Sequence, residues 1–225
     1  MSALATPPLR AHAESHQATA VAAKLHIRWL GRRAYEPVWR EMQRFTAERS
    51  ATSADEIWLL EHEPVFTLGM NADRSHLLAP GDIPVVQIDR GGQVTYHGPG
   101  QLVVYALIDV RRAGLSVRAL VSALEGSVID YAAQLGVRAE GRPQAPGVYV
   151  QGRKLASVGL RIRRGGSYHG LALNVSLDLE PFARINPCGF AGLEMTQLSQ
   201  LGGPSSVEQA AAELRPLLAA RLRHG

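Results

Sequence analysis

Cysteine is almost absent from this sequence, whose 225 residues contain only Cys188. A single cysteine cannot form an intramolecular disulfide, so we expect a reducing compartment, the cytoplasm. No apolar run is long enough to span a bilayer. Residues 1–23 lack the compact apolar stretch of a secretory signal, and their Ala-, Pro- and His-rich composition predicts a disordered extension. We expect the remaining residues, 24–225, to form a single domain.

Signatures of several common protein classes are also missing. The sequence has no visible internal repeat, no P-loop, no GxGxxG fingerprint and no paired spacing of metal ligands. It carries a net charge of +4, and its densest basic cluster is GLRIRRGG at residues 159–166. One short cluster is not an extended basic stripe, so we expect neither nucleic acid nor a membrane as partner. An acidic protein partner and ordinary surface charge both stay open.

The hydrophobic pattern predicts several short strands. Alternating or continuous apolar runs predict them at residues 24–31, 56–69 (with a proline break), 81–92, 101–110 and, as antiparallel hairpins, 147–175. The run at 101–110 is apolar at almost every position, which is typical of a central strand buried on both faces.

Helical spacing of apolar residues predicts helices at residues 34–51 and 117–135. Ser116 is the expected N-cap of the second helix, and Gly136 suits the position just after its end. Ser205 with Glu208 predicts a capping box at the start of a last helix near the C-terminus. The order of elements predicts an α+β fold with mixed, largely antiparallel sheets packed with helices.

A glycine-rich loop joins two predicted strands, in the sequence DRGGQVTYHGPGQLVVY at residues 89–105. Glycines let a ligand approach the backbone closely. Arg90, Tyr96 and His97 add polar groups beside them. The alternative is a plain β-turn made by the same glycines and a proline. We favour a ligand-binding loop.

Lys154 begins an alternating strand in the sequence GRKLASVGLR. It has the same parity as Val158 and Leu160, which places it on the apolar face of that strand. Burying a lysine charge without a partner is costly. On spacing alone, a strand-end lysine that extends to water is the favoured reading. A lysine held in a partly apolar site is the alternative.

Cys188 stands in INPCGF, between a proline and a glycine. It is either a small buried apolar residue or a nucleophile aimed by a stiff turn. An adjacent ammonium such as that of Lys154 would favour the thiolate and could carry the thiol proton to a leaving group. Such a pair suits acyl transfer through a thioester. The sequence alone does not bring together two residues that are 34 positions apart.

Four motifs together identify a family. RGGQVTYHGPGQLVVY, GRKLASVGLR, SYHGLALNV and INPCGF resemble, in order and spacing, the lipoyl(octanoyl) transferases. The resemblance covers about residues 25–200, and Ala106 departs from it where the family usually has proline after the tyrosine. It implies a fold like that of the biotin and lipoate protein ligases.

The resemblance also implies a reaction. An octanoyl or lipoyl group passes from the phosphopantetheine of acyl carrier protein to a lysine of lipoyl domains, in oxo-acid dehydrogenase E2 subunits or the glycine cleavage H protein. Exchange between thioesters needs no ATP, and we expect no cofactor. The alternative is an ATP-dependent lipoate–protein ligase of the same fold. We expect the protein to act as a monomer.

The resemblance assigns roles residue by residue. Cys188 matches the acyl-accepting nucleophile and Lys154 its partner. The positions that match the substrate loops are Arg90, Gly91, Gly92, Gln93, Val94, Thr95, Tyr96, His97, Ser157, Val158, Gly159, Gly170, Leu171 and Ala172.

Several finer expectations follow from these roles. Apolar strands would form the walls of an acyl tunnel, and backbone N–H groups near Gly159 or Gly189 would stabilise the oxyanion. The basic residues Arg161, Arg163 and Arg164 would attract the acidic carrier protein.

Two histidines, His97 and His169, are the closest in sequence to these loops. We expect structural hydrogen bonds from both rather than metal ligation. A general base at His97 in place of Lys154 is the minor alternative.

Overall fold

The computed structural model describes residues 24–223, so the extension expected at residues 1–23 lies outside the described part. The helices are α1 (Tyr35–Glu48), α2 (Val117–Gln134) and α3 (Val207–Arg223). The strands are β1 (Leu25–Arg33), β2 (Asp55–His62), β3 (Val65–Leu68), β4 (Val85–Gln87), β5 (Val94–His97), β6 (Gln101–Leu107), β7 (Glu140–Gly141), β8 (Gly147–Val150), β9 (Arg153–Arg163) and β10 (Gly166–Asn174). Short 3₁₀ turns are η1 (Arg74–His76), η2 (Glu180–Arg184), η3 (Pro187–Gly189) and η4 (Leu198–Leu201).

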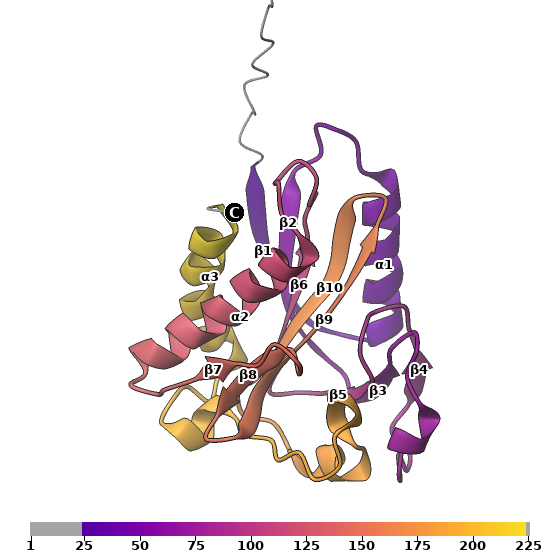
Figure 1. Ribbon diagram of the computed structural model, residues 1–225, viewed down its shortest axis with the longest axis vertical. Coiled ribbons are helices and arrows are strands. Elements are labelled where there is room, and N and C mark those ends of the chain that lie inside the picture. Colours follow the sequence, from indigo (N-terminus) through magenta and orange to yellow (C-terminus); the bar gives the residue numbers. More distant parts are fainter. Residues whose placement is uncertain (1–23, 224–225) are drawn as a thin grey trace, which may run out of the picture.

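These elements form a seven-stranded sheet in the order β1-β2-β6-β10-β9-β8-β7 and a three-stranded sheet in the order β4-β3-β5. Among the strands of residues 24–223, only the β1–β2 and β3–β4 pairs are parallel. The predicted α+β fold with mixed, largely antiparallel sheets is confirmed. In Figure 1, α2 and α3 cover one face of the large sheet, and α1 covers part of the other.

The central strands explain why almost every residue in them is apolar. In β2, Ile57 and Leu59 pack toward α2 and α3, while Trp58 and Leu60 pack toward α1. Side chains alternate across a sheet, so a strand with helices on both faces needs apolar residues at successive positions. The same alternation runs through β6. The central strand expected at residues 101–110 is thereby confirmed.

Capping follows the sequence in one helix and departs from it in another. The Ser116 hydroxyl accepts the Ala119 N–H at 3.1 Å, which confirms the predicted N-cap of α2. In α3, Ser206 rather than Ser205 accepts the Gln209 N–H, at 3.3 Å. The capping box predicted on Ser205 is therefore wrong by one residue, because two adjacent serines satisfy the same local pattern.

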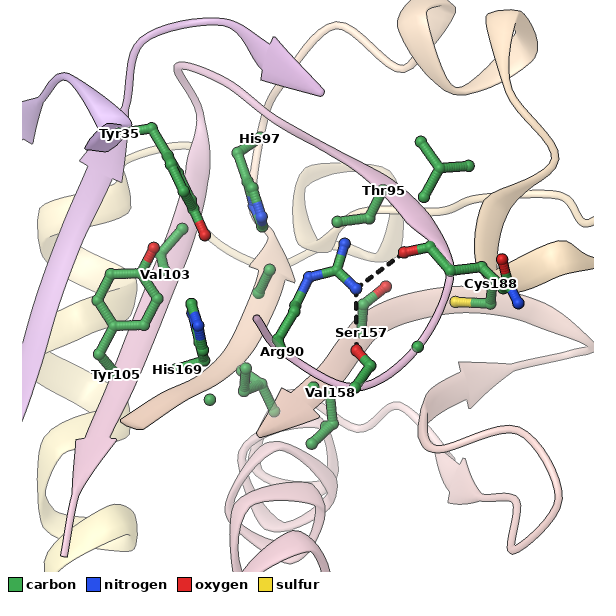
Figure 2. Close-up of a pocket in the computed structure, with 18 residues that line it drawn as sticks. Tyr35, Arg90, Thr95, His97, Val103, Tyr105, Ser157, Val158, His169 and Cys188 are labelled. Atoms are coloured by element: carbon green, nitrogen blue, oxygen red, sulfur yellow. Dashed lines mark hydrogen bonds between the residues drawn. The ribbon is translucent and has the colours of Figure 1, made fainter. Parts of the chain in front are cut away.

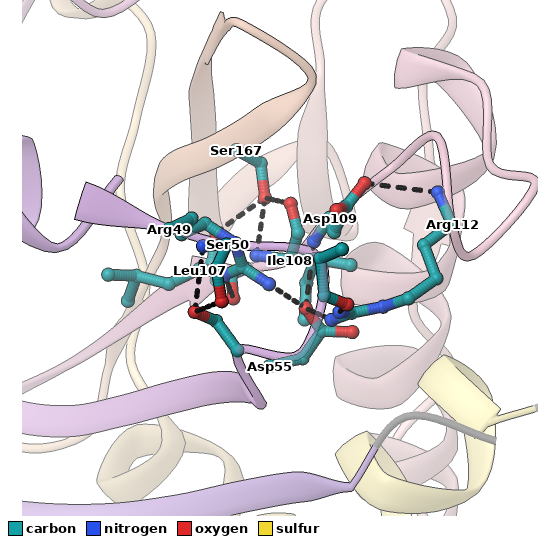
Figure 3. A network of polar contacts seen from close by, with 11 residues as sticks. Arg49, Ser50, Asp55, Leu107, Ile108, Asp109, Arg112 and Ser167 are labelled. Carbon is teal, nitrogen blue, oxygen red and sulfur yellow. Dashed lines mark hydrogen bonds and ion pairs between the residues drawn. The ribbon is translucent and has the colours of Figure 1, made fainter. Parts of the chain in front are cut away.

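A buried polar network fastens the end of the large sheet that lies away from the small sheet (Figure 3). The carboxylate of Asp55, at the start of β2, binds the guanidinium groups of Arg49 and Arg112. The same carboxylate accepts the N–H of Asp109 at 2.8 Å. This network joins the end of α1 to the turn after β6. It fixes one end of the large sheet, and the pocket described below lies toward the other end.

Two absences concern the described residues only. Between residues 24 and 223, no helix is both long and apolar enough to cross a membrane. Over the same range, no three His, Cys, Asp or Glu side chains are grouped as a metal site would require.

Candidate active site

A pocket of about 490 Å³, its open mouth included, lies between the large sheet and the glycine-rich loop (Figure 2). Strands β6, β9 and β10 supply much of its wall. The lining residues are Tyr35, Arg90, Gly91, Gly92, Gln93, Val94, Thr95, His97, Val103, Tyr105, Ser157, Val158, Gly159, His169, Gly170, Leu171, Ala172 and Cys188.

Cys188 lies at one end of this pocket, in the 3₁₀ turn η3. Its backbone is left-handed, with φ 56° and ψ 19°, a conformation that costs a non-glycine residue about 1–2 kcal/mol. Hydrogen bonds on both sides hold the turn: Asn186 N–H donates to the His76 carbonyl, and Phe190 N–H donates to the Pro187 carbonyl. Cys188 is half-buried, has strained backbone and lines a pocket. These features favour a nucleophile over a buried core residue at this position.

Lys154 reaches Cys188. Its Nζ lies 3.1 Å from Sγ and donates a second hydrogen bond, also of 3.1 Å, to the Pro146 carbonyl. The ammonium also lies 5.1 Å from the centre of the Tyr149 ring. The side chain is fully buried, so the expectation that it extends to water is wrong. The spacing of residues along β9 could not predict this burial, because the residues that cover Lys154 come from another part of the chain.

The segment that covers Lys154 is a short stretch of chain around Glu194 and Thr196, after the turn that holds Cys188. Lys154 N–H donates to the Glu194 carbonyl at 2.8 Å, and Thr196 N–H donates to the Lys154 carbonyl at 3.0 Å. The chain from η3 therefore runs directly against the start of β9. Backbone pairing of this kind brings together two residues that are 34 positions apart in sequence.

Arg90 shapes the glycine-rich loop from within. Its guanidinium donates to the carbonyls of Gly91, Gln93 and Thr67 and to the Thr67 hydroxyl, at 2.7 to 3.0 Å. Burial lowers the pKa of Arg90. Arg90 was expected to be a polar group for the ligand, but these hydrogen bonds show that it also braces the loop.

Glycines make room at two points around this loop. A Cβ on Gly159 would lie 3.1 Å from the Arg90 side chain, and one on Gly170 would lie 2.1 Å from the Val104 carbonyl. The first glycine lets the Arg90 side chain pack against β9, and the second lets β10 approach β6 closely. Both sequence-predicted positions therefore have a packing role as well as a place in the pocket wall.

The end of the pocket away from Cys188 is formed by tyrosine and histidine (Figure 2). Tyr35 stacks on His97 at 5.8 Å between ring centres, and His62 hydrogen-bonds the Tyr105 hydroxyl at 2.7 Å behind them. Burial lowers the pKa of His97 to about 3 and that of His62 to about 4, and it raises that of Tyr35. These side chains are therefore neutral at physiological pH. We call Tyr35, His62, His97 and Tyr105 the His–Tyr cluster.

His169 makes the structural hydrogen bond expected of it, from Nε2 to Asp89 at 3.0 Å. Asp89 also accepts from Trp39 at 2.8 Å and from the Tyr168 hydroxyl. Burial alone would raise the pKa of Asp89, but hydrogen bonds from His169, Tyr168 and Trp39 outweigh it and hold the pKa well below its usual range. His97 hydrogen-bonds Gln101 at 2.7 Å, whereas the thiol contacts Lys154, so the geometry favours Lys154 as its proton partner.

The structure brings most of the sequence-predicted site residues together, with two exceptions. Tyr96 packs against Phe66 and Phe182 rather than lining the pocket, and its side chain lies on the opposite face of β5 from those of Thr95 and His97. The Gly189 N–H donates to the Asn186 carbonyl at 3.0 Å, so the expectation that it stabilises an oxyanion is not supported.

Four lining residues were not among the predicted substrate positions: Tyr35, Val103, Tyr105 and His169, the last of which was expected only to make a structural hydrogen bond. Val103 and Tyr105 stand inside a motif quoted above, but their exposure to the pocket depends on which face of β6 they occupy. Tyr35 is the first residue of α1 and gave no signal in the sequence.

The three arginines expected to attract a carrier protein lie in different places. Arg161 contacts the Met70 sulfur at 3.3 Å, next to the glycine-rich loop. Arg163 and Arg164 lie at the turn between β9 and β10, where Gly166 bridges to Asp109 near the Asp55 network. Only Arg161 is close to the pocket.

Comparison with known proteins agrees with this arrangement. Residues 34–218 match the family model of the lipoyl protein ligase A/B catalytic domain. An octanoyltransferase of Pseudomonas fluorescens (strain Pf0-1) is 62% identical over 198 residues, which is 88% of this chain and 92% of that protein. An octanoyltransferase of Shewanella pealeana is 57% identical over 198 residues, 88% of this chain and 90% of that protein.

Solved structures show the same fold at low sequence identity. A bipartite lipoate protein ligase of Thermoplasma acidophilum superposes with a TM-score of 0.65 at 13% identity, over 88% of this chain and 81% of that one. From the family model and the relatives together, this chain belongs to the octanoyltransferases of the lipoyl protein ligase A/B family.

Proposed function

We propose that the protein transfers an octanoyl or lipoyl group from acyl carrier protein to a lysine of a lipoyl domain, through a thioester on Cys188. The observation that carries this proposal is the 3.1 Å contact between Cys188 Sγ and Lys154 Nζ at the end of the pocket. The octanoyltransferase relatives support the acyl group and the reaction class.

In the first half-reaction, Cys188 Sγ attacks the carbonyl carbon of the octanoyl thioester. A bond forms between Sγ and the acyl carbon, and the bond from that carbon to the phosphopantetheine sulfur breaks. The thiol proton resides on Lys154, whose ammonium faces the Sγ thiolate, and Lys154 donates this proton to the departing sulfur and becomes a neutral amine. Its contact with Sγ and its burial away from water favour this shuttle.

In the second half-reaction, the amine of the target lysine attacks the acyl carbon on Cys188. The carbon–nitrogen bond forms, the bond to Sγ breaks, and the neutral Lys154 amine takes the surplus proton, which restores the ammonium beside the Sγ thiolate. An amide is more stable than a thioester, so the sequence of steps needs neither ATP nor another cofactor.

The pocket suits an uncharged chain. Apolar residues such as Val103, Val158 and Leu171 contribute to its wall, and the His–Tyr cluster at its far end is neutral. Each methylene buried contributes about 0.8 kcal/mol, so a chain that fills the pocket binds better than acetyl.

We infer that the partners are acyl carrier protein and the lipoyl domains of oxo-acid dehydrogenase E2 subunits and of the glycine cleavage H protein. The archaeal ligase of the same fold is described with its E2 lipoyl domain, which supports this kind of acceptor. Arg161 beside the glycine-rich loop offers positive charge to an acidic carrier. We infer a cytoplasmic location, because the lone thiol must stay reduced to react.

The test is a transfer assay with purified protein, octanoyl-acyl carrier protein and an apo lipoyl domain, without ATP. We expect octanoylation of the lipoyl domain, read as a mass increase on its target lysine. Product that forms only from free octanoate and ATP would instead assign the protein to the ligases. No product under either condition would reject both activities.

A further inference from the structure

The hydrogen bond that orients Lys154 depends on a peptide group that is itself held from behind. The acceptor of the Lys154 ammonium is the Pro146 carbonyl, at 3.1 Å. The N–H of the same peptide unit belongs to Gly147, and it donates to Oε1 of Glu125 at 2.6 Å. Because a peptide unit is planar with its C=O and N–H pointing in opposite directions, one rigid group connects the carboxylate to the ammonium.

The surrounding residues fit this connection closely. Glu125 is a half-buried residue of α2, and its other oxygen lies 3.3 Å from where a Cβ on Gly141 would be. The carboxylate therefore binds one end of the loop between β7 and β8, at Gly147, and lies close to the other end, at Gly141. A Cβ on Gly147 would lie 2.6 Å from Lys154 Cε, and the residue has φ +140°, so glycine is needed there for the lysine to pass.

Charge gives the connection a second role. No carboxylate of residues 24–223 lies within salt-bridge distance of Lys154 Nζ, although the side chain is fully buried. Burial raises the pKa of Glu125, while the Gly147 N–H and the Lys154 charge oppose that rise. A carboxylate that accepts from one end of a peptide polarises it and strengthens the acceptor at the other end.

We propose that Glu125 is a positioning residue for the acyl transfer, acting through the Pro146–Gly147 peptide to hold and stabilise the Lys154 ammonium beside Cys188. The proposal rests on the proposed function for the identity of the reacting pair. Glu125 touches neither the substrate pocket nor the thiol, so its effect passes entirely through Lys154.

The experiment measures alkylation of Cys188 by iodoacetamide across pH, which requires no acyl donor. We expect Glu125→Ala to slow alkylation at pH 7 about tenfold, the effect of losing one hydrogen bond to a charged group. Glu125→Gln keeps an acceptor for Gly147 but no charge, and we expect about a threefold loss because a neutral hydrogen bond is about half as strong.

Two controls separate positioning from folding. Glu61→Gln alters a carboxylate that holds the Gly100 N–H at 2.7 Å in the same manner, away from Lys154, and we expect an unchanged alkylation profile. In a Lys154→Met background, Glu125→Gln and Glu125→Ala should have no further effect, because the residue through which they act is gone.

The outcomes are distinct. An effect of Glu125 variants that disappears in the Lys154→Met background supports the proposal, and Glu125→Gln decides if Glu125→Ala does not fold. The proposal is overturned if the Glu125 variants slow alkylation equally in the wild-type and Lys154→Met backgrounds, or if they slow it in neither. Failure of the wild-type protein to take up octanoyl would reject the proposed function, yet it would leave the alkylation result readable.

Discussion

Acidification from pH 7 to pH 5 is expected to destabilise the protein through two buried imidazoles of the His–Tyr cluster, His62 and His97. Burial lowers their pKa values to about 4 and about 3, from 6.5 in an unfolded chain. Between these values the unfolded chain binds protons that the folded chain does not, so the free energy of unfolding falls as pH falls below about 6.5. At about 1.4 kcal/mol per pH unit, reaching pH 5 costs about 2 kcal/mol for each imidazole.

Urea titrations at pH 7 and pH 5, followed by tryptophan fluorescence, measure this loss directly. His97→Gln removes one of these groups and keeps a polar side chain for Gln101, so its loss between the two pH values should be smaller than that of the wild type by about 2 kcal/mol. His26→Gln changes an exposed histidine and should leave the wild-type loss intact. If His97→Gln loses as much stability as the wild type, the assignment of acid sensitivity to this cluster is wrong.

Three further substitutions test the site. Lys154→Met should slow alkylation of Cys188 at pH 7 about tenfold, because the neighbouring positive charge is lost; an unchanged rate would leave Lys154 without a role in activation. Arg90→Lys cannot reproduce a fork that binds three backbone carbonyls, and we expect unfolding in urea to show a loss of about 2 kcal/mol; wild-type stability would contradict the bracing role. Gly69→Ala would place a Cβ 1.8 Å from a loop carbonyl and should cost about 2 kcal/mol by the same titration, whereas Gly91→Ala has room and serves as control; equal losses would refute the packing argument.

The sequence predicted what local patterns encode. The buried strands β2 and β6 and the capped helix α2 follow from periodicity and a single serine, and the structure has them close to the expected bounds. The α3 cap was misplaced because Ser205 and Ser206 are equivalent in a local pattern, and only the hydrogen bond to Gln209 distinguishes them.

The site was predictable in its residues and not in its geometry. The burial of Lys154 depends on the segment around Glu194 and Thr196, which no spacing along β9 can show. Tyr35 reaches the pocket from the start of α1, far from any motif. Contacts between distant parts of the chain are set by packing, and a local pattern carries no information about them.

The central claim is that Cys188 carries the acyl group, and the mass of the intact protein tests it most directly. Incubated with octanoyl-acyl carrier protein and no acceptor, the wild type should gain the mass of one octanoyl group, and hydroxylamine should remove it. Cys188→Ala should gain nothing under the same conditions. A hydroxylamine-labile octanoyl adduct on Cys188→Ala would contradict the account, because another residue would then be the nucleophile.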